Sequence, residues 1–183
     1  MDVPTQQPEN DRATVLMPIN HYLPGYKAGG PIRKLASLVE GLGGEYTFKV
    51  VTKDRDFKDR TAYPGVAIDT WSHVGKAEIG YLSPDSLSFW RLRRLLRDTD
   101  YDLMYLNSFF EPHFAIKPLL LRRLGLIPPR PVIVAPNGEF SVGALKLKGL
   151  KKRLYMLIAR LLRLYRGVLW QAASEYEVAD IRR

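Results

Sequence analysis

The segment Lys27-Ala28-Gly29-Gly30-Pro31 lies between a predicted first strand and a predicted first helix. In an open α/β sheet, ligands bind beyond the carboxyl ends of the strands, which is where this segment falls. Glycine lets the backbone approach a ligand closely, and the free N–H groups at a helix N-terminus attract phosphate. Gly29 and Gly30 are therefore candidates for phosphate binding, although a plain turn without a ligand would use the same residues. The junction is neither GxGxxG nor a GKS or GKT loop, so NAD-dependent enzymes and P-loop NTPases lose support.

Two other patterns bear on metal binding. Asp98-Thr99-Asp100 has the spacing of a DxD metal motif, but it lies between a predicted helix and the strand beginning at Tyr101, whereas a metal-binding DxD usually follows a strand. We interpret it as an acidic turn. His21, His73 and His113 are too scattered to suggest a metal triad. The sequence predicts no metal site.

Short apolar segments alternate with segments of helical periodicity. Strands are predicted at 13–19, 45–52, 65–71, 79–82, 101–106, 132–135 and 168–173, and helices at 31–42, 86–97, 112–124 and 144–165, with a closing helix from Ser174. This alternation is typical of a parallel sheet covered by helices on both faces. The expected fold class is α/β, with a doubly wound, mostly parallel, Rossmann-like sheet.

Composition narrows the class of protein. The chain has 183 residues, 46% of them hydrophobic, which suits one packed domain. It has no Cys, so disulfides and thiolate zinc sites are excluded, and no apolar run approaches the ~18 residues of a membrane span. Residues 1–12 are polar and do not resemble a secretory signal. We expect a disordered arm over 1–12, one domain over 13–183 and a cytoplasmic location.

The charge is concentrated in one segment. The net charge is +9, and no acidic residue lies between Glu139 and Glu175. The helix predicted at 144–165 has apolar residues at helical spacing, which predicts a buried face, and its bases fall largely elsewhere. A basic amphipathic helix can lie on an anionic membrane, so we expect peripheral contact through 144–166 unless the basic face is simply solvated. The apolar residues are Leu147, Leu150, Leu154, Leu157, Ile158, Leu161 and Tyr165.

Four segments occur in an order and spacing that are specific in combination. They are the glycine-rich loop and helix at 24–43, the strand end Tyr105-Leu106-Asn107-Ser108-Phe109-Phe110, the segment 135–141 (APNGEFS) leading into 144–155, and the segment 172–181 (AASEYEVADI). Together they span nearly all of the chain from Val15 onward. This combination resembles the N-terminal, acceptor-side domain of retaining GT-B glycosyltransferases of family 4.

The resemblance implies one half of a GT-B architecture, without the C-terminal domain that binds most of the donor. The complete enzyme would transfer a sugar from a nucleoside-diphosphate sugar to a glycan or lipid-linked hydroxyl acceptor in bacterial surface-glycan synthesis. No cofactor or metal is expected, and this chain alone would be inactive. Gly29 and Gly30 would meet the donor diphosphate, and Glu139 and Asn137 would hold the catalytic positions. The acceptor side would be lined by Asn107, Ser108, His113 and Gly138, although the sequence favours a surface or helix-start histidine for His113.

One position departs from the family pattern. Asn137 stands where relatives often carry His or Arg, and Asn can neither act as a base nor carry positive charge. Glu139 therefore becomes the more interesting side chain. It could equally be a charge near the start of the following helix.

A non-enzymatic module that binds nucleic acid or another polyanion is the rival interpretation. Its bases would lie on one long helix without interleaved exposed aromatic residues or a recognised nucleic-acid motif, so no nucleic-acid partner is expected. A steep loss of binding with salt would distinguish it.

Overall fold

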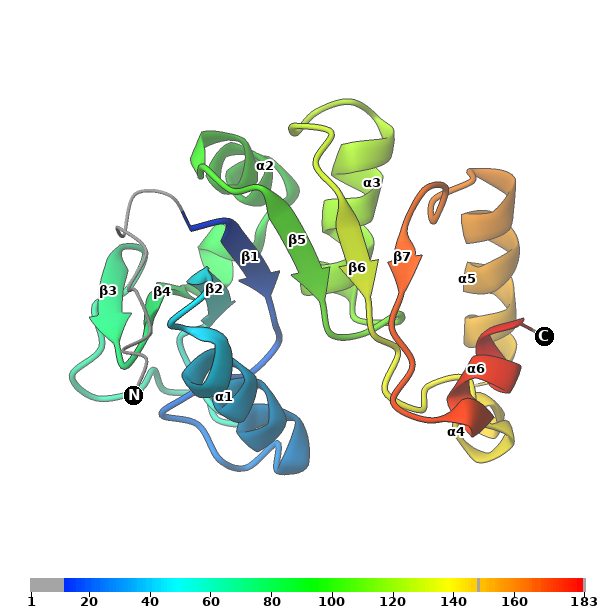
Figure 1. Cartoon of the computed structure of the whole chain (residues 1–183), viewed down its shortest axis with the longest axis horizontal. Coiled ribbons are helices and arrows are strands. Elements are labelled where there is room, and N and C mark those ends of the chain that lie inside the picture. The colour runs from blue at the N-terminus through cyan, green and yellow to red at the C-terminus, as the bar shows by residue number, and fades with distance from the viewer. Residues whose placement is uncertain (1–11, 148, 183) are drawn as a thin grey trace, which may run out of the picture.

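The computed structural model describes residues 12–147 and 149–182. They form an α/β structure on one seven-stranded sheet (Figure 1). The strands are β1 (Thr14–Pro18), β2 (Thr47–Lys53), β3 (Trp71–Val74), β4 (Ala77–Leu82), β5 (Leu103–Leu106), β6 (Val132–Val134) and β7 (Leu169–Trp170). Their order across the sheet is β3-β4-β2-β1-β5-β6-β7, and every neighbouring pair is parallel except β3 and β4.

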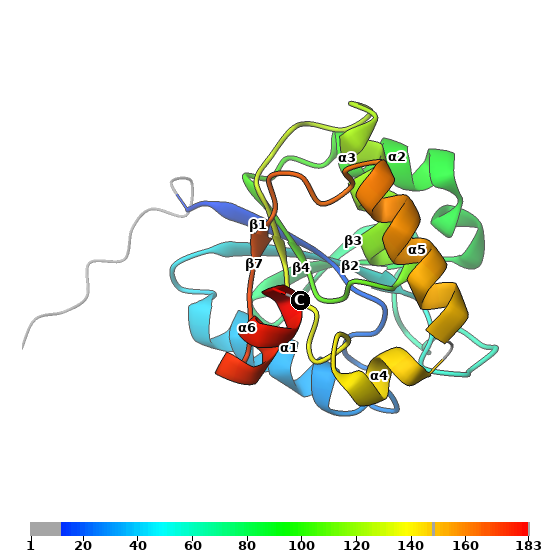
Figure 2. The same ribbon diagram turned by 90° about the vertical axis from the view of Figure 1, so that its right-hand side faces the viewer.

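Helices cover both faces of the sheet. They are α1 (Gly30–Leu42), α2 (Phe89–Asp98), α3 (Lys117–Arg123), α4 (Val142–Lys146), α5 (Gly149–Leu161) and α6 (Glu175–Arg182), with the short helical turns η2 (Pro84–Leu87) and η3 (Pro112–Ile116). Figure 2 shows α2, α3 and α5 on one face and α1 and α6 on the other. The predicted α/β class with a mostly parallel sheet is confirmed.

Alternation along the strands divides the apolar side chains between two clusters. Leu16 of β1 packs with the cluster that contains residues of α2 and α3, whereas Val15 and Met17 pack with Leu35 of α1. Successive side chains of a strand point to opposite faces, so a strand buried on both sides is apolar throughout. This explains the continuous apolar run of β1.

The strand order creates a crevice at the carboxyl edge. Starting from β1, the parallel strands follow the doubly wound order in which winding reverses between β1 and β5. The chain leaves β1 towards α1 on one face and leaves β5 towards α3 on the other. The loops after these two strands therefore diverge, and ligands of such sheets bind between them.

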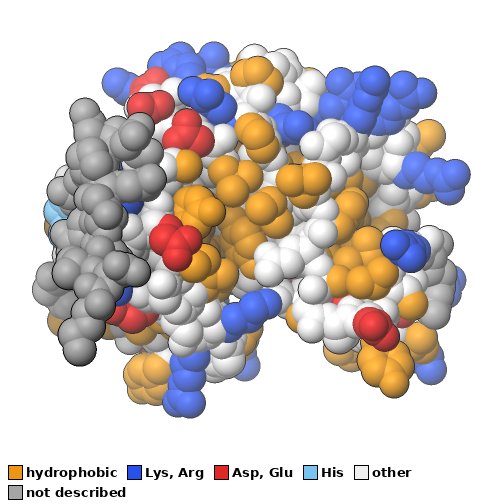
Figure 3. Space-filling model, in the orientation of Figure 1, with side chains coloured by type: hydrophobic (Ala, Val, Ile, Leu, Met, Phe, Trp, Pro, Cys, Tyr) orange, Lys and Arg blue, Asp and Glu red, His pale blue; other side chains and the backbone are white. Residues whose placement is uncertain are grey.

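The face that carries α1 is incompletely covered. An apolar groove of about 600 Å³ runs beside α1 and is lined by Leu38, Tyr46, Leu103 and Ile133 among others. Figure 3 shows hydrophobic side chains gathered over this part of the sheet.

The strand predicted at 65–71 is wrong. Gly65 (φ 75°) and Asp69 (φ 58°) have left-handed backbone conformations that interrupt an extended segment, and only Ile68 forms an isolated bridge, to Tyr81. The strand in this region is β3, which begins at Trp71 and pairs antiparallel with β4.

The helix predicted at 144–165 is broken. Leu147, after α4, has extended backbone (φ −69°, ψ 117°), and α5 starts at Gly149 and ends at Leu161. The leucines of the apolar face predicted to be buried are exposed, because α5 turns Ala159 towards the sheet and the leucines away from it. Tyr165, beyond the end of α5, is partly buried and packs against the core as predicted. The strand predicted at 168–173 is shortened to β7.

The predicted arm over 1–12 lies outside the described residues except for Arg12, whose guanidinium donates a hydrogen bond to Gly43 O at 3.2 Å. No helix within the described ranges is both long enough and apolar enough to cross a bilayer.

Candidate functional site

A cavity of about 470 Å³ opens at the crevice between β1 and β5. It is formed by the loops that follow β1, β5 and β6 and by the first turn of α1. Its polar lining is contributed by Asn20, His21, Lys27, Asn107, Ser108, Glu111 and Glu139. Three of the residues predicted for the site, Asn107, Ser108 and Glu139, thus lie together.

The carboxylate of Glu139 holds the loop that follows β5. Oε1 accepts a hydrogen bond from Ser108 Oγ at 2.8 Å, and Oε2 accepts from the N–H groups of Phe109 and Phe110 at 2.5 and 3.3 Å. Burial raises the pKa of Glu139, and the three hydrogen bonds oppose this shift only in part. Glu139 therefore positions Ser108 and is a carboxyl that takes up a proton more readily than an exposed one.

Asn137 joins the ends of two strands. Its amide nitrogen donates to Asn107 Oδ1 at 2.9 Å and to Ala135 O at 2.8 Å, and its Oδ1 accepts from Lys34 Nζ at 2.6 Å. Lys34 lies on α1 and places a positive charge next to Asn137, which is itself uncharged. Sequence reasoning missed Lys34, because the two residues are far apart in the chain. Asn137 contacts the site through Asn107 and does not line the main cavity.

Gly138 is bonded through its backbone to the side chain of Glu177. Its backbone is left-handed (φ 80°), and its N–H donates to Glu177 Oε1 at 2.6 Å. Glu177 is buried, and its Oε2 accepts from Ala173 N at 2.6 Å, so one carboxylate ties the loop after β6 to the start of α6. Gly138 lines a smaller cavity beside Glu177 instead of the main one.

Gly29 and Gly30 lie exposed where the loop enters α1. Gly29 has φ 72° and ψ −132°, a conformation open essentially to glycine alone, whereas Gly30 is the first residue of α1 and has no positive φ. A Cβ at either position would meet nothing within 4 Å. The neighbours Lys27, Ala28 and Pro31 line the cavity, and the two glycines lie beside it.

Asp56, which was not predicted to belong to the site, fixes this glycine loop. Its buried carboxylate accepts hydrogen bonds from the N–H groups of Tyr26, Lys27 and Phe57 at 2.9, 3.1 and 2.7 Å. Burial alone would raise the pKa of Asp56, but these bonds outweigh it and hold the pKa below its usual value. The loop before α1 is therefore anchored to the loop after β2.

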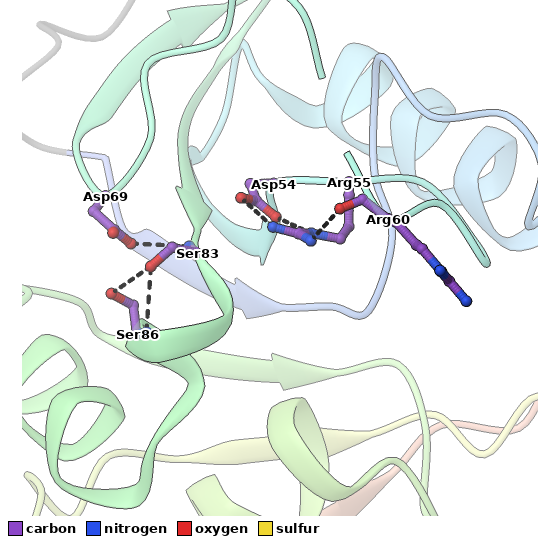
Figure 4. Close-up of polar contacts among 6 residues, drawn as sticks. All are labelled: Asp54, Arg55, Arg60, Asp69, Ser83 and Ser86. Carbon is purple, nitrogen blue, oxygen red and sulfur yellow. Dashed lines mark hydrogen bonds and ion pairs between the residues drawn. The ribbon is translucent and has the colours of Figure 1, made fainter. Parts of the chain in front are cut away.

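Further polar contacts hold the neighbouring loops (Figure 4). Arg55 donates to both carboxylate oxygens of Asp54 and to Arg60 O. After β4, Ser83 N donates to Asp69 Oδ1 at 3.0 Å, and the hydroxyl of Ser83 accepts from Ser86 N. These contacts shape the carboxyl edge on the side of β2 and β4.

A second cavity of about 410 Å³ adjoins the first and contains His113. The Nδ1 atom of His113 lies 3.0 Å from Lys117 Nζ and 3.4 Å from Leu87 O. Burial and the charge of Lys117 lower the pKa of His113, and burial also lowers the pKa of Lys117. Burial raises the pKa of Glu111, which accepts from Phe114 N at the start of η3. His113 thus belongs to this second cavity and not to the main one.

His21 lines both cavities and, with Asn20, offers free polar atoms. Asn20 Oδ1 and His21 Nδ1 are buried and have no hydrogen-bond partner in the part of the chain that the structure describes. Burial and Lys53 lower the pKa of His21, which favours a neutral imidazole. A buried polar atom without a partner costs free energy, so a side-chain rotation that brought either atom to a ligand hydroxyl would be favoured. Neither residue was selected from the sequence for the site.

Aromatic side chains lie behind the 108–110 loop. The ring of Phe109 stacks on that of Tyr165 with centroids 4.4 Å apart, and Tyr165 stacks on Trp170 at 5.4 Å. The hydroxyl of Tyr165 donates to Phe109 O at 2.9 Å and lies 2.6 Å from the hydroxyl of Tyr155 on α5. The loop held by Glu139 is therefore also connected to α5.

Asp98-Thr99-Asp100 forms a turn between α2 and β5, as predicted. It lies at the start of β5, at the opposite edge of the sheet from the cavity, and Thr99 Oγ1 donates to Leu95 O at 2.7 Å. In residues 12–147 and 149–182, no group of three or more Asp, Glu, His or Cys side chains could hold a metal ion.

The site is a cavity with a largely apolar wall and several polar side chains, at the point where the winding of the sheet reverses, with a partly buried carboxyl group and two unpartnered polar atoms among the described residues. No protein-family model matches the chain, and comparisons with curated proteins and with solved structures found no match.

Proposed function

We propose that the chain is the acceptor-side domain of a retaining GT-B glycosyltransferase, which moves a sugar from a nucleoside-diphosphate sugar to a glycan or lipid-linked hydroxyl. The observation that carries this proposal is the cavity in which Asn107, Ser108 and Glu139 face the start of α1. The four-segment resemblance supplies the family, and the strand order is of the kind that binds nucleotides at the reversal point.

The start of α1 suits the donor diphosphate. Gly29 and Gly30 are exposed there, and the first turn of a helix carries a partial positive charge. Pro31 has no N–H, and the N–H groups of Gly29 and Ile32 donate to backbone oxygens of the same loop, so the charge of the helix start, more than free N–H groups, would attract the diphosphate. Lys34 lies close by on α1 with its ammonium bonded to the neutral Asn137 side chain, whereas the ammonium of Lys27 is paired with Asp59 at 2.6 Å. When the sugar–phosphate bond breaks, the electron pair leaves with the diphosphate, and the helix start and Lys34 would stabilise its negative charge. We propose that a second domain supplies the remaining donor contacts.

The acceptor hydroxyl would bind deeper in the cavity. Asn107 and Ser108 are held in place by hydrogen bonds to Asn137 and Glu139. Asn20 Oδ1 and His21 Nδ1 have no hydrogen-bond partner in the described part of the chain. Glu139 would orient the acceptor through Ser108, and its raised pKa suits it to exchanging the proton that the hydroxyl loses.

Amide NMR titration of the chain tests where ligands bind. With methyl glycosides as acceptor probes and uridine diphosphate as a donor probe, we expect shifts at 20–21, 27–32 and 107–111. Asn20→Ala removes an atom that has no internal partner, so it should weaken glycoside binding and leave the fold intact. Ser37→Ala, on the exposed side of α1, is the matched control. Shifts confined to other surfaces would refute the proposed site.

An activity assay tests whether this chain needs a second domain for sugar transfer. The purified chain should transfer no sugar from any nucleotide-sugar donor, because half of the cleft offers few donor contacts. Transfer by the 183-residue chain alone would refute the proposal that it is half of an enzyme.

A further inference from the structure

Helix α5 exposes its apolar side to solvent. Leu150, Leu154, Leu157 and Leu161, the leucine face, are 84%, 57%, 56% and 73% exposed, whereas Ala159 is buried. An isolated exposed leucine needs no explanation, but four on one helix form a contiguous apolar surface. Leu147, which lies before the start of α5, is also 71% exposed.

The helical geometry places these residues on one narrow stripe. At about 100° per residue, the four leucines fall within roughly 60° of one another, and Ala159 falls on the opposite side. With a rise of about 1.5 Å per residue, the leucine face is roughly 17 Å long. The stripe is therefore opposite to the side that packs on the sheet.

Bases border the stripe on both sides. By the same geometry, Lys151 lies on one flank and Arg153 and Arg160 on the other, and all three are exposed. No acidic residue occurs in the sequence between Glu139 and Glu175, although Asp180 of α6 lines the same hollow as Arg160. Lys152 is not part of this set, because its Nζ donates to Ala144 O at 2.7 Å and lies over the ring of Phe110.

The position of α5 leaves this surface accessible. Figures 1 and 2 show α5 at the outer edge of the domain, beyond β7. The surface is a convex ridge, with apolar residues along its crest and bases along its sides. Long basic side chains at the border of an apolar stripe can reach lipid phosphates while the stripe enters the acyl region.

The charges beside the leucine face favour an anionic lipid surface over a second copy of the chain as its partner. The leucines alternate at spacings of four and three residues, as in a coiled-coil seam, but the bordering positions would then bring bases of both copies together. Nucleic acid would match the charge but would leave the leucines in water.

We infer that α5 is a membrane-docking helix, whose leucine face enters the interface of an anionic lipid bilayer while Lys151, Arg153 and Arg160 contact lipid phosphates. This inference is independent of the proposed sugar transfer. The sequence predicted that the apolar residues of this helix would be buried and that only its bases would contact a membrane. In the structure both the leucines and the flanking bases of α5 are exposed.

Vesicle co-sedimentation of the chain tests the inference. Vesicles of phosphatidylcholine alone and of phosphatidylcholine with phosphatidylglycerol are compared at low and high salt. Leu154→Gln/Leu157→Gln removes apolar area without changing charge, and Lys151→Glu/Arg160→Glu reverses two flanking charges. Leu42→Gln/Val74→Gln, at exposed apolar positions on other elements, is the matched control. Circular dichroism and thermal melting establish that each variant folds.

The chain should bind the phosphatidylglycerol vesicles and be partly released by salt. Each base near the surface contributes about fivefold to the partition coefficient. Replacing two bases should therefore weaken binding at least ~25-fold, and charge reversal should weaken it further. The leucine variant should lose binding by at least ~10-fold, and the control should match the original chain.

Three results would overturn the inference: no binding to phosphatidylglycerol vesicles, full binding by the leucine variant, or equal binding to neutral vesicles. A dimer in sedimentation equilibrium that the leucine variant abolishes, without vesicle binding, would assign the face to a second copy of the chain instead. Retention on nucleic acid but not on vesicles would assign the bases to a polyanion.

Discussion

The hydrogen bonds of Glu139 and Glu177 differ in a way that substitution by Gln should reveal. In Glu139 one oxygen accepts from both backbone N–H groups and the other accepts only from the Ser108 hydroxyl. In Glu177 each oxygen accepts from one backbone N–H. Gln keeps one acceptor oxygen and replaces the other by an NH₂ donor.

The two substitutions should therefore have different costs. In Glu139→Gln the oxygen can still accept from Phe109 N, and the NH₂ group can donate to Ser108 Oγ, so the free energy of unfolding should fall by about 1 kcal/mol or less. In Glu177→Gln one backbone N–H must face the NH₂ group, which leaves a buried donor unsatisfied at a cost of about 1–3 kcal/mol. Glu139→Ala leaves three donors without this acceptor and should cost roughly 2–5 kcal/mol.

Urea unfolding of the variants, followed by circular dichroism, measures these differences. Ser108→Ala combined with Glu139→Ala completes a double-mutant cycle, in which we expect a coupling energy of about 0.5–1.5 kcal/mol. Equal losses in Glu139→Gln and Glu177→Gln would refute the argument, because the same chemical change would then be insensitive to how the oxygens are used.

Three further predictions concern the same edge of the sheet. Gly29→Ala should cost about 1–3 kcal/mol of unfolding free energy because of its φ and ψ, whereas Gly30→Ala should be neutral or slightly stabilising; equal melting temperatures would contradict this. His21 and His113 should titrate by NMR with pKa values below 6.5. The folded state then resists their protonation, so stability is lost as pH falls below 6.5 through the folded pKa values, and replacing both by Gln should flatten that loss; a midpoint at or above 6.5 would count against it. Tyr165→Phe removes the hydrogen bond to the site loop and should cost about 0.5–1.5 kcal/mol in urea unfolding, whereas an unchanged midpoint would mean that the bond contributes nothing.

The elements that follow from local pattern were predicted well. The strands β1, β2, β5 and β6 are apolar runs of short length, and α1 has clear helical spacing between a proline and two glycines. Such signals depend only on neighbouring residues. The segment 65–71 failed because its alternation is interrupted by left-handed residues, whose conformation depends on contacts made elsewhere.

The leucines of α5 show a different limit. Helical spacing predicts that residues share a face, but it does not tell whether another element covers that face. In α5 the sheet receives the side of Ala159, and the leucines remain outside. The break before Gly149 was within reach of the sequence, since glycine disfavours a helix interior.

The candidate site was predicted in part. Asn107, Ser108 and Glu139 lie together as expected, because the carboxyl ends of parallel strands share one edge of the sheet. The contacts of Lys34 with Asn137 and of Asp56 with the glycine loop join residues about 30 or more positions apart. No local pattern contains them. His113 was placed near the right strand, but the turn η3 directs it into the adjoining cavity.

The stacked rings of Phe109, Tyr165 and Trp170 provide an optical signal from within the domain. Indole emission depends on neighbouring rings and on solvent, and Trp170 is 39% exposed at the end of a stack that leads to the site loop. Replacing Trp71 and Trp90 by Phe would leave Trp170 as the single emitter among the chain's three tryptophans. Ligand entry at the cavity and lipid contact at α5 would then each alter the colour or lifetime of the same fluorophore. Stopped-flow fluorescence could time the two events without an attached dye.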